Sequence, residues 1–154
     1  MASILSGMKM ENKIGGNGQM QFDDYILVDK DHEYMCYKSK VEKVIFGKTV
    51  DGDDYEINVA IEFQDQINTN MVLDSYLKWL ERCVDIVATY MEEVYGESLP
   101  DHWKESIEVY SVSITYNSED DYGATIAFGE SIFPDHIIEL DFEKEEIIDN
   151  RLNG

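Results

Sequence analysis

The chain has 154 residues, of which 33 are acidic and 12 are basic, so its formal net charge at pH 7 is −21. This charge repels a phosphate backbone and argues against direct binding to nucleic acid. It favours cationic partners instead, because a strongly charged surface speeds their association. Between Glu92 and Asp149 there are 17 acidic residues and two basic ones, so the excess is concentrated in the C-terminal part.

The composition is that of a folded domain. Hydrophobic residues make up 44% and aromatic residues 12% of the chain, more than an acidic disordered segment carries. Residues 1–18 have little hydrophobic periodicity and are expected to be a flexible leader, followed by a single α+β domain over residues 19–154. There is neither a long apolar run nor a signal-peptide pattern, so a cytoplasmic protein without a membrane span is expected.

The first part of the domain is predicted to consist of strands. Short strands are expected at 22–28 and 34–37, with a polar turn between them. Residues 41–50 and 55–63 are expected to pair as a hairpin around the acidic turn at 51–54. The reason is that an Asp-Gly turn precedes a strict alternation of apolar and polar residues.

One long helix is predicted at about residues 70–95. Asn68 or Thr69 can cap its start, and Gly96 suits the left-handed residue at its end. Further apolar side chains widen the stripe beyond a coiled-coil seam, so the helix is expected to lie across a sheet. A short second helix is expected at 101–107. The apolar residues of the long helix recur every three or four positions: Leu73, Leu77, Leu80, Val84, Val87, Met91 and Val94.

The last part returns to strands. Alternation at 110–116, 122–128 and 138–142 predicts three of them, and residues 146–150 are expected to add a terminal strand. Because strands, helix and strands follow one another through short connections, the expected fold is α+β. It consists of an antiparallel sheet of about five to seven strands with the long helix packed across one face.

No catalytic or metal-binding signature is present. His32, His102 and His136 have no spacing that pairs them with a cysteine, and Cys36 and Cys83 are expected to be buried free thiols. Zinc-ligand spacings are missing, and the acidic turns do not match a calcium loop. No cofactor, metal or catalytic residue is therefore predicted, although the abundant carboxylates leave a carboxylate-based hydrolase open.

An acidic surface on the C-terminal strands is the predicted partner-binding site. Negative charge steers a cationic partner, and tyrosine rings supply contact area at low entropic cost. A solvated face that only keeps the protein in solution is the alternative. For Tyr122 the alternation leaves two placements open, an outward ring or a ring in the core. The expected contact residues are Glu119, Asp120, Asp121, Tyr122, Glu130, Asp135, Glu139 and Asp141.

Two segments carry a family resemblance: the run YLKWL at residues 76–80 and the run FPDHIIELDF at residues 133–142. Together with the order of elements over about residues 20–150, they are similar to small acidic immunity proteins of bacterial toxin–immunity systems. Such proteins bind and block a cognate toxin, often a basic nuclease, and share no catalytic residues. The resemblance implies a non-enzymatic inhibitor that occludes a basic toxin or nuclease domain.

The same charge fits a second hypothesis. A phage-type anti-defence protein or DNA mimic would present surface carboxylates where a nucleic-acid-binding enzyme expects phosphates. Charge does not separate the two hypotheses, but selectivity does. A DNA mimic competes with DNA for several unrelated basic proteins, whereas an immunity protein binds one cognate partner.

Overall fold

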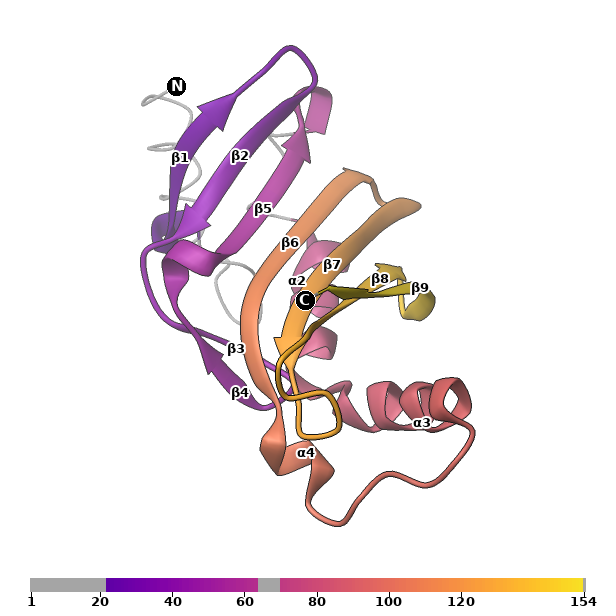
Figure 1. Cartoon of the computed structure of the whole chain (residues 1–154). Helices are drawn as coiled ribbons and strands as arrows, with labels where there is room; N and C mark the ends of the chain where they lie inside the picture. The colour runs from indigo at the N-terminus through magenta and orange to yellow at the C-terminus, as the bar shows by residue number, and fades with distance from the viewer. Residues whose placement is uncertain (1–21, 64–69, 154) are drawn as a thin grey trace.

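The computed structural model describes residues 22–63 and 70–153, and the predicted leader at 1–18 lies outside these residues. A seven-stranded sheet in the order β1-β2-β5-β6-β7-β8-β9 carries helices on one face, with a separate β3-β4 hairpin (Figure 1). The helices are α2 (Met71–Arg82), α3 (Val84–Tyr95) and α4 (Trp103–Ser106), with 3-10 turns η1 (Phe22–Asp24) and η2 (Gly52–Asp54). The strands are β1 (Tyr25–Lys30), β2 (Tyr34–Ser39), β3 (Lys43–Ile45), β4 (Lys48–Val50), β5 (Tyr55–Ala60), β6 (Glu108–Ser118), β7 (Asp121–Gly129), β8 (Ile137–Glu143) and β9 (Glu146–Asn153).

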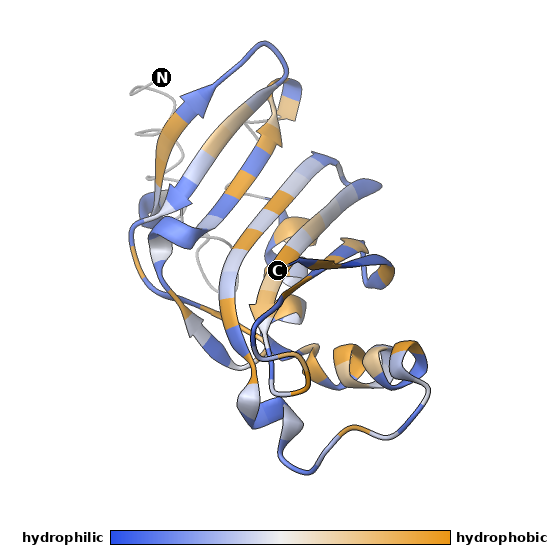
Figure 2. Cartoon of the chain, viewed as in Figure 1, coloured by the Kyte–Doolittle hydropathy of each residue, from blue (hydrophilic) through white to orange (hydrophobic). Residues whose placement is uncertain are grey.

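Alternation along the strands places apolar side chains on the helix-covered face of the sheet. Figure 2 shows the alternation clearly along β5 and β6. Burial of each large apolar side chain contributes about 1.5–3 kcal/mol, so the covered face supplies much of the stability. One row of paired residues crosses this face from β2 to β9: Tyr37, Ile57, Ile114, Ala124, Phe142 and Ile147.

The largely antiparallel sheet expected from the sequence is confirmed, with one exception. β5 and β6 are parallel, whereas the other neighbouring strands of the main sheet are antiparallel. Parallel neighbours need a crossover connection, and the chain between β5 and β6 supplies it through α2, α3 and α4. The helices therefore come to lie on one face of the sheet.

The hairpin predicted between 41–50 and 55–63 is wrong. Residues 41–50 form their own hairpin, β3-β4, which turns at Phe46 and Gly47. These two residues have φ values of 55° and 75°, as a type I′ turn requires. β5 pairs with β2 and β6 instead, while residues 52–54 form η2, capped by the Asp51 side chain, which accepts from the N–H of Asp53.

The single long helix predicted at 70–95 is also wrong. α2 and α3, each of 12 residues, meet at Cys83. The carbonyls of Leu80 and Glu81 accept hydrogen bonds from the backbone N–H groups of Phe46 (3.2 Å) and Gly47 (2.8 Å). In a continuous helix these carbonyls would accept from residues four positions later. The tip of the β3-β4 hairpin therefore occupies the acceptors with which the helix would have continued.

The side chain at that hairpin tip lies in the core. Phe46 is 2% exposed and contacts Phe128 edge-on at a centroid distance of 5.8 Å. A second ring, Phe142, lies at 6.4 Å. The hairpin is thus held by its backbone bonds to α2 and by the burial of one large ring.

The helix ends are partly as predicted. Gly96 is left-handed (φ 74°) and ends α3 through its N–H, which donates to the carbonyl of Glu92. The predicted caps Asn68 and Thr69 lie outside the described residues. In the structure Asn70 caps α2, because its side chain accepts from the N–H of Leu73 at 3.0 Å.

Candidate partner-binding surface

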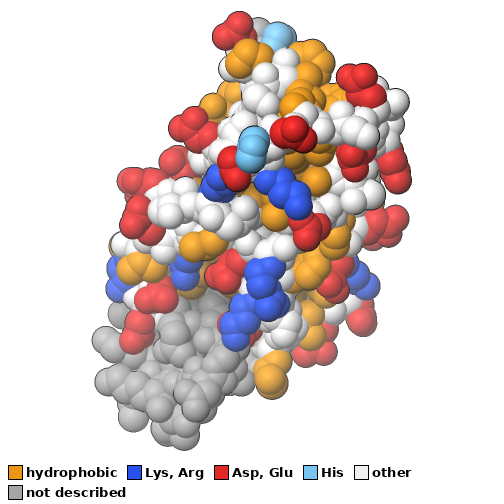
Figure 3. Space-filling model, turned by 90° about the horizontal axis from the view of Figure 1, so that it is seen from below, with side chains coloured by type: hydrophobic (Ala, Val, Ile, Leu, Met, Phe, Trp, Pro, Cys, Tyr) orange, Lys and Arg blue, Asp and Glu red, His pale blue; other side chains and the backbone are white. Residues whose placement is uncertain are grey.

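The predicted contact residues do not gather in one place. Glu119, Asp120 and Asp121 are exposed at the turn between β6 and β7, whereas Asp135 is exposed in the connection between β7 and β8. These positions lie at opposite ends of the nine-residue strand β7, so roughly 25 Å of strand separates them at ~3.3 Å per residue. Glu139 and Asp141 lie in a third place, on the uncovered face of β8. In Figure 3, carboxylates are scattered over the coloured part of the face, while several Lys and Arg side chains lie near its middle and others toward its edges.

Glu130 is not a surface residue, so the expectation that it faces outward is wrong. It is 5% exposed. Its carboxylate accepts from the indole N–H of Trp103 (2.8 Å), the hydroxyl of Tyr95 (3.3 Å) and the backbone N–H of Phe133 (2.7 Å). Three donors replace the water that a buried carboxylate loses. Glu130 therefore ties α3 and α4 to the end of β7.

Tyr122 belongs to the helix-covered side of the sheet, at the edge of the core. Its half-buried ring contacts Tyr76 of α2 at a centroid distance of 4.8 Å and Tyr116 at 6.3 Å. Burial is the main reason that its pKa is raised, and the nearby carboxylate of Glu145 adds to this effect. Of the two placements left open by the sequence, packing against the core describes this ring better.

Glu139 and Asp141 share the guanidinium of Arg151 from the neighbouring strand. Arg151 donates to both carboxylate oxygens of Asp141, at 2.5 and 3.1 Å, and to Glu139 at 3.4 Å. Thr125 donates its hydroxyl to Asp141 at 2.8 Å. The hydrogen bonds from Arg151 are the main reason that the pKa of Asp141 is lowered. Part of the negative charge on this face is thus neutralised within the protein.

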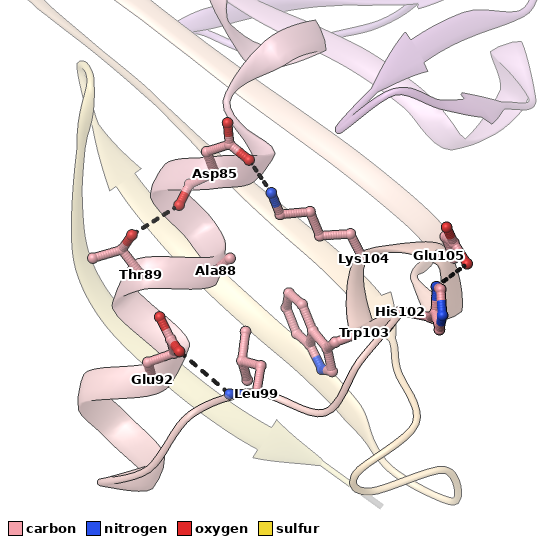
Figure 4. Close-up of a pocket in the computed structure, with 9 residues that line it drawn as sticks. All are labelled: Asp85, Ala88, Thr89, Glu92, Leu99, His102, Trp103, Lys104 and Glu105. Carbon is pink, nitrogen blue, oxygen red and sulfur yellow. Dashed lines mark hydrogen bonds and ion pairs between the residues drawn. The ribbon is translucent and has the colours of Figure 1, made fainter.

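A depression of about 570 Å³ lies between α3 and the segment that contains α4 (Figure 4). Lys104 reaches from α4 and forms an ion pair with Asp85 of α3. Glu92 accepts from the N–H of Leu99 at 3.3 Å, and His102 contacts Glu105 at 3.1 Å between Nδ1 and Oε2. Each of these carboxylates thus has a partner within the chain, and Lys104 balances the charge of Asp85.

A second depression, here called the α3–β9 groove, has a different character. It has a volume of about 430 Å³ and lies between α3 and the turn that joins β8 to β9. Its apolar and aromatic lining consists of Ile86, Tyr90 and Ile147, and Thr89 also lines it. Apart from Asp85, which is paired with Lys104, its acids meet no base among the residues that line it. Its acidic lining consists of Asp85, Glu93, Glu145 and Glu146.

A third depression of about 500 Å³ adjoins this groove and shares Glu145 with it. Its aromatic wall is formed by Tyr76 and Trp79, whose rings stack at 5.9 Å, and by Tyr122. Arg82 also lines it. The turn between β8 and β9 therefore stands between an acidic apolar groove on the α3 side and a mixed aromatic one on the α2 side.

The two thiols are poor candidates for catalysis. Both cysteines are free, as expected, although Cys36 is only half-buried. Burial, assisted by the hydrogen bond from Cys36 to Glu56, raises the pKa of Cys36 to about 12, and burial raises that of Cys83 to about 12. Thiols with such pKa values stay protonated at neutral pH and are not nucleophiles.

Two further observations concern metals and membranes. Within residues 22–63 and 70–153, no group of three or more His, Cys, Asp and Glu side chains is arranged to hold a metal ion. None of the helices in the same ranges combines the length and the apolar composition of a membrane span.

Comparison with known proteins does not assign the chain to a family. No protein-family model matches the sequence, and neither the curated proteins nor the solved structures give a match. The resemblance to immunity proteins therefore stays a prediction.

The α3–β9 groove was missed by reasoning from the sequence. Ile86 and Tyr90, four residues apart on α3, are among the apolar side chains that widen the stripe of the predicted helix, which the sequence predicts to face the sheet. Nothing in the sequence distinguishes Glu93 and Glu145 from the many other acidic residues. The available signal was the acidic turn after residue 143, but its position beside α3 follows only from the order of strands in the sheet.

Proposed function

We propose that this protein is a non-enzymatic inhibitor of the immunity type, which binds a basic toxin or nuclease domain and blocks it. The observation that carries the proposal is the α3–β9 groove, where apolar side chains and four carboxylates line the same depression. Apolar contact provides affinity, and the carboxylates steer and select a cationic partner. Lys and Arg side chains combine an aliphatic stem with a charged head, so they complement such a groove.

Binding is favoured over catalysis by the state of the reactive groups. The two thiols have raised pKa values, and the carboxylates beside Trp103 and Leu99 in the α3–α4 depression are bonded to neighbouring groups. An immunity-type inhibitor protects the cell that makes the toxin, so the proposal places this protein in the cytoplasm of that cell.

The proposal is tested by capture and rescue. The tagged protein is used to capture partners from its host at low ionic strength, and each captured basic domain is then expressed with and without it. We expect a stable complex, loss of the toxin's activity and recovery of growth. Affinity should fall strongly with salt, because the Debye length shrinks from ~30 Å at 0.01 M to ~8 Å at 0.15 M. The proposal would be refuted if no basic domain were captured, or if the captured domains kept their activity and toxicity in the presence of this protein.

Selectivity separates the immunity-type inhibitor from a DNA mimic. The protein is added to a set of unrelated DNA-binding enzymes, and DNA binding by each is measured. We expect the captured domain alone to be inhibited. If the protein competed with DNA for most enzymes of the set, the result would contradict the proposal and support the DNA-mimic hypothesis.

A further inference from the structure

β9 forms a free edge of the main sheet. The strand order ends with β9, and no other strand pairs with its outer side in the described part of the chain. It is eight residues long, against six for β1 at the opposite edge. An edge strand presents unpaired N–H and C=O groups, which are a template for pairing with a further strand.

Helix α3 backs this edge and leaves apolar side chains uncovered beside it. Asn150 of β9 donates its side-chain N–H to the hydroxyl of Tyr90 at 2.7 Å, which links the strand to the helix. Ile86, Tyr90 and Val94 recur every four residues along one flank of α3. Ile86 and Val94 are each 44% exposed, although residues on the neighbouring flank are buried.

The apolar side of β9 is similarly incomplete. Ile147 pairs with Phe142 and Leu152 pairs with Ile138, so both lie on the helix-covered face of the sheet. Phe142 and Ile138 are each only 3% exposed, whereas Leu152 is 49% exposed. The apolar layer between sheet and helix is thus open to solvent at the last strand of the sheet.

The charge around this edge identifies what can cover it. Glu93 projects from α3, while Glu145 and Glu146 come from the turn and the start of β9. A second copy of the chain carries the same net charge of −21, and this like charge opposes its association with the first copy. A segment that carries Lys or Arg would instead neutralise them.

We propose that β9 and the α3–β9 groove bind an extended basic segment of a partner protein, which pairs with β9 as an eighth strand of the main sheet. Its side chains on the α3 side would be apolar or long-stemmed, covering Ile86, Val94 and Leu152. Its Lys or Arg head groups would reach Glu93, Glu145 and Glu146. The identity of the partner rests on the proposed function, but the mode of binding does not.

The two edges of the sheet provide a matched pair of variants. Ile148 and Leu152 of β9 are 56% and 49% exposed, and Ile26 and Val28 of β1 are 51% and 50% exposed. Replacing either pair with lysine changes the net charge equally, so long-range attraction of a cationic ligand changes equally. Any difference in binding between I148K/L152K and I26K/V28K therefore reports on the edge itself.

The probe is a synthetic peptide of alternating Lys and Val, whose affinity for the whole chain is measured by calorimetry. We expect I148K/L152K to weaken binding by about tenfold or more and I26K/V28K by less than about twofold, since a tenfold change corresponds to the loss of a few good contacts. Amide hydrogen exchange should show new protection in residues 146–153 and none in 25–30. A Glu-Val peptide should not bind.

Thermal unfolding of both lysine variants verifies that they are folded. A further variant, E93Q, leaves the backbone of β9 untouched and should also weaken binding of the Lys-Val peptide.

Each other outcome counts against a defined proposal. Equal effects of the two lysine pairs, protection away from β9, or no peptide binding would overturn the edge-binding inference. If the peptide protects β9 but the protein blocks no basic domain, only the proposed function is refuted. If the protein blocks a basic domain and that domain gives no new protection in β9, only the edge-binding inference is refuted.

Discussion

Two hairpin turns of this protein each hold a non-glycine residue at positive φ, but in opposite environments. Phe46 (φ 55°) is 2% exposed in the core, whereas Lys144 (φ 52°) is exposed between β8 and β9. This conformation costs about 1–2 kcal/mol per residue. At Phe46 the burial of a ring offsets the cost. At Lys144 the N–H donates to the carbonyl of Tyr122 at 3.0 Å, which fixes the turn that carries Glu145. The strained residue thus places a ring in the core in the first hairpin, whereas in the second it shapes an exposed turn.

The largest effect is expected for Phe46→Ala. Loss of the buried ring should lower the free energy of unfolding by about 3–5 kcal/mol, measured by denaturant titration. Val44→Ala is the control, because Val44 lies in β3 but is 41% exposed, and its effect should stay within about 0.5 kcal/mol. A similar small loss for Phe46→Ala would mean that the ring does not anchor the hairpin.

A second contrast between buried and exposed groups concerns two carboxylates. Glu130→Gln should destabilise the fold by about 1–3 kcal/mol, because the amide donates where the carboxylate accepted and leaves a buried donor unpaired. Glu145→Gln, at the exposed turn, should change stability by no more than about 0.5 kcal/mol. Denaturant titration compares the two variants. Equal effects would break the distinction between the buried and the exposed site.

A glycine at each turn sharpens the comparison. Lys144→Gly relieves strain without losing burial, so it should raise the free energy of unfolding by up to about 1 kcal/mol. Phe46→Gly should be destabilised, but less than Phe46→Ala, since glycine accepts positive φ. Thermal unfolding of the three variants gives the order. Strain at Lys144 is disproved if Lys144→Gly unfolds at a lower temperature than the parent.

The smallest expected effect is on the pH dependence of stability. The pKa of Asp141 is lowered in the folded protein by Arg151, so its contribution is present above the pKa of the unfolded state. It is lost as the pH falls from about 5 through the folded pKa. Arg151→Gln should therefore lower stability at pH 7 slightly and leave it nearly unchanged at the acid end of this range. If Arg151→Gln lowered the melting temperature by the same amount at every pH, this coupling would be contradicted.

Local patterns in the sequence predict most strands and the helical stripe, but they do not predict contacts that arise from topology. The alternation from Tyr55 onward gives β5, and Gly96 ends α3 as expected. The break at Cys83 is not marked by a proline or a glycine. It arises because the N–H groups of a hairpin distant in the sequence bond to the carbonyls at the end of α2. The α3–β9 groove likewise exists only once β9 lies beside α3.

The capture of the Leu80 and Glu81 carbonyls by the β3-β4 hairpin also has a consequence for the order of folding. Before the hairpin docks, nothing local interrupts the segment from residue 71 to residue 95, and helix formation is faster than strand pairing between distant segments. Without the docked hairpin, this segment should therefore form one continuous helix. The break at Cys83 would then form in the same step that buries the ring of Phe46.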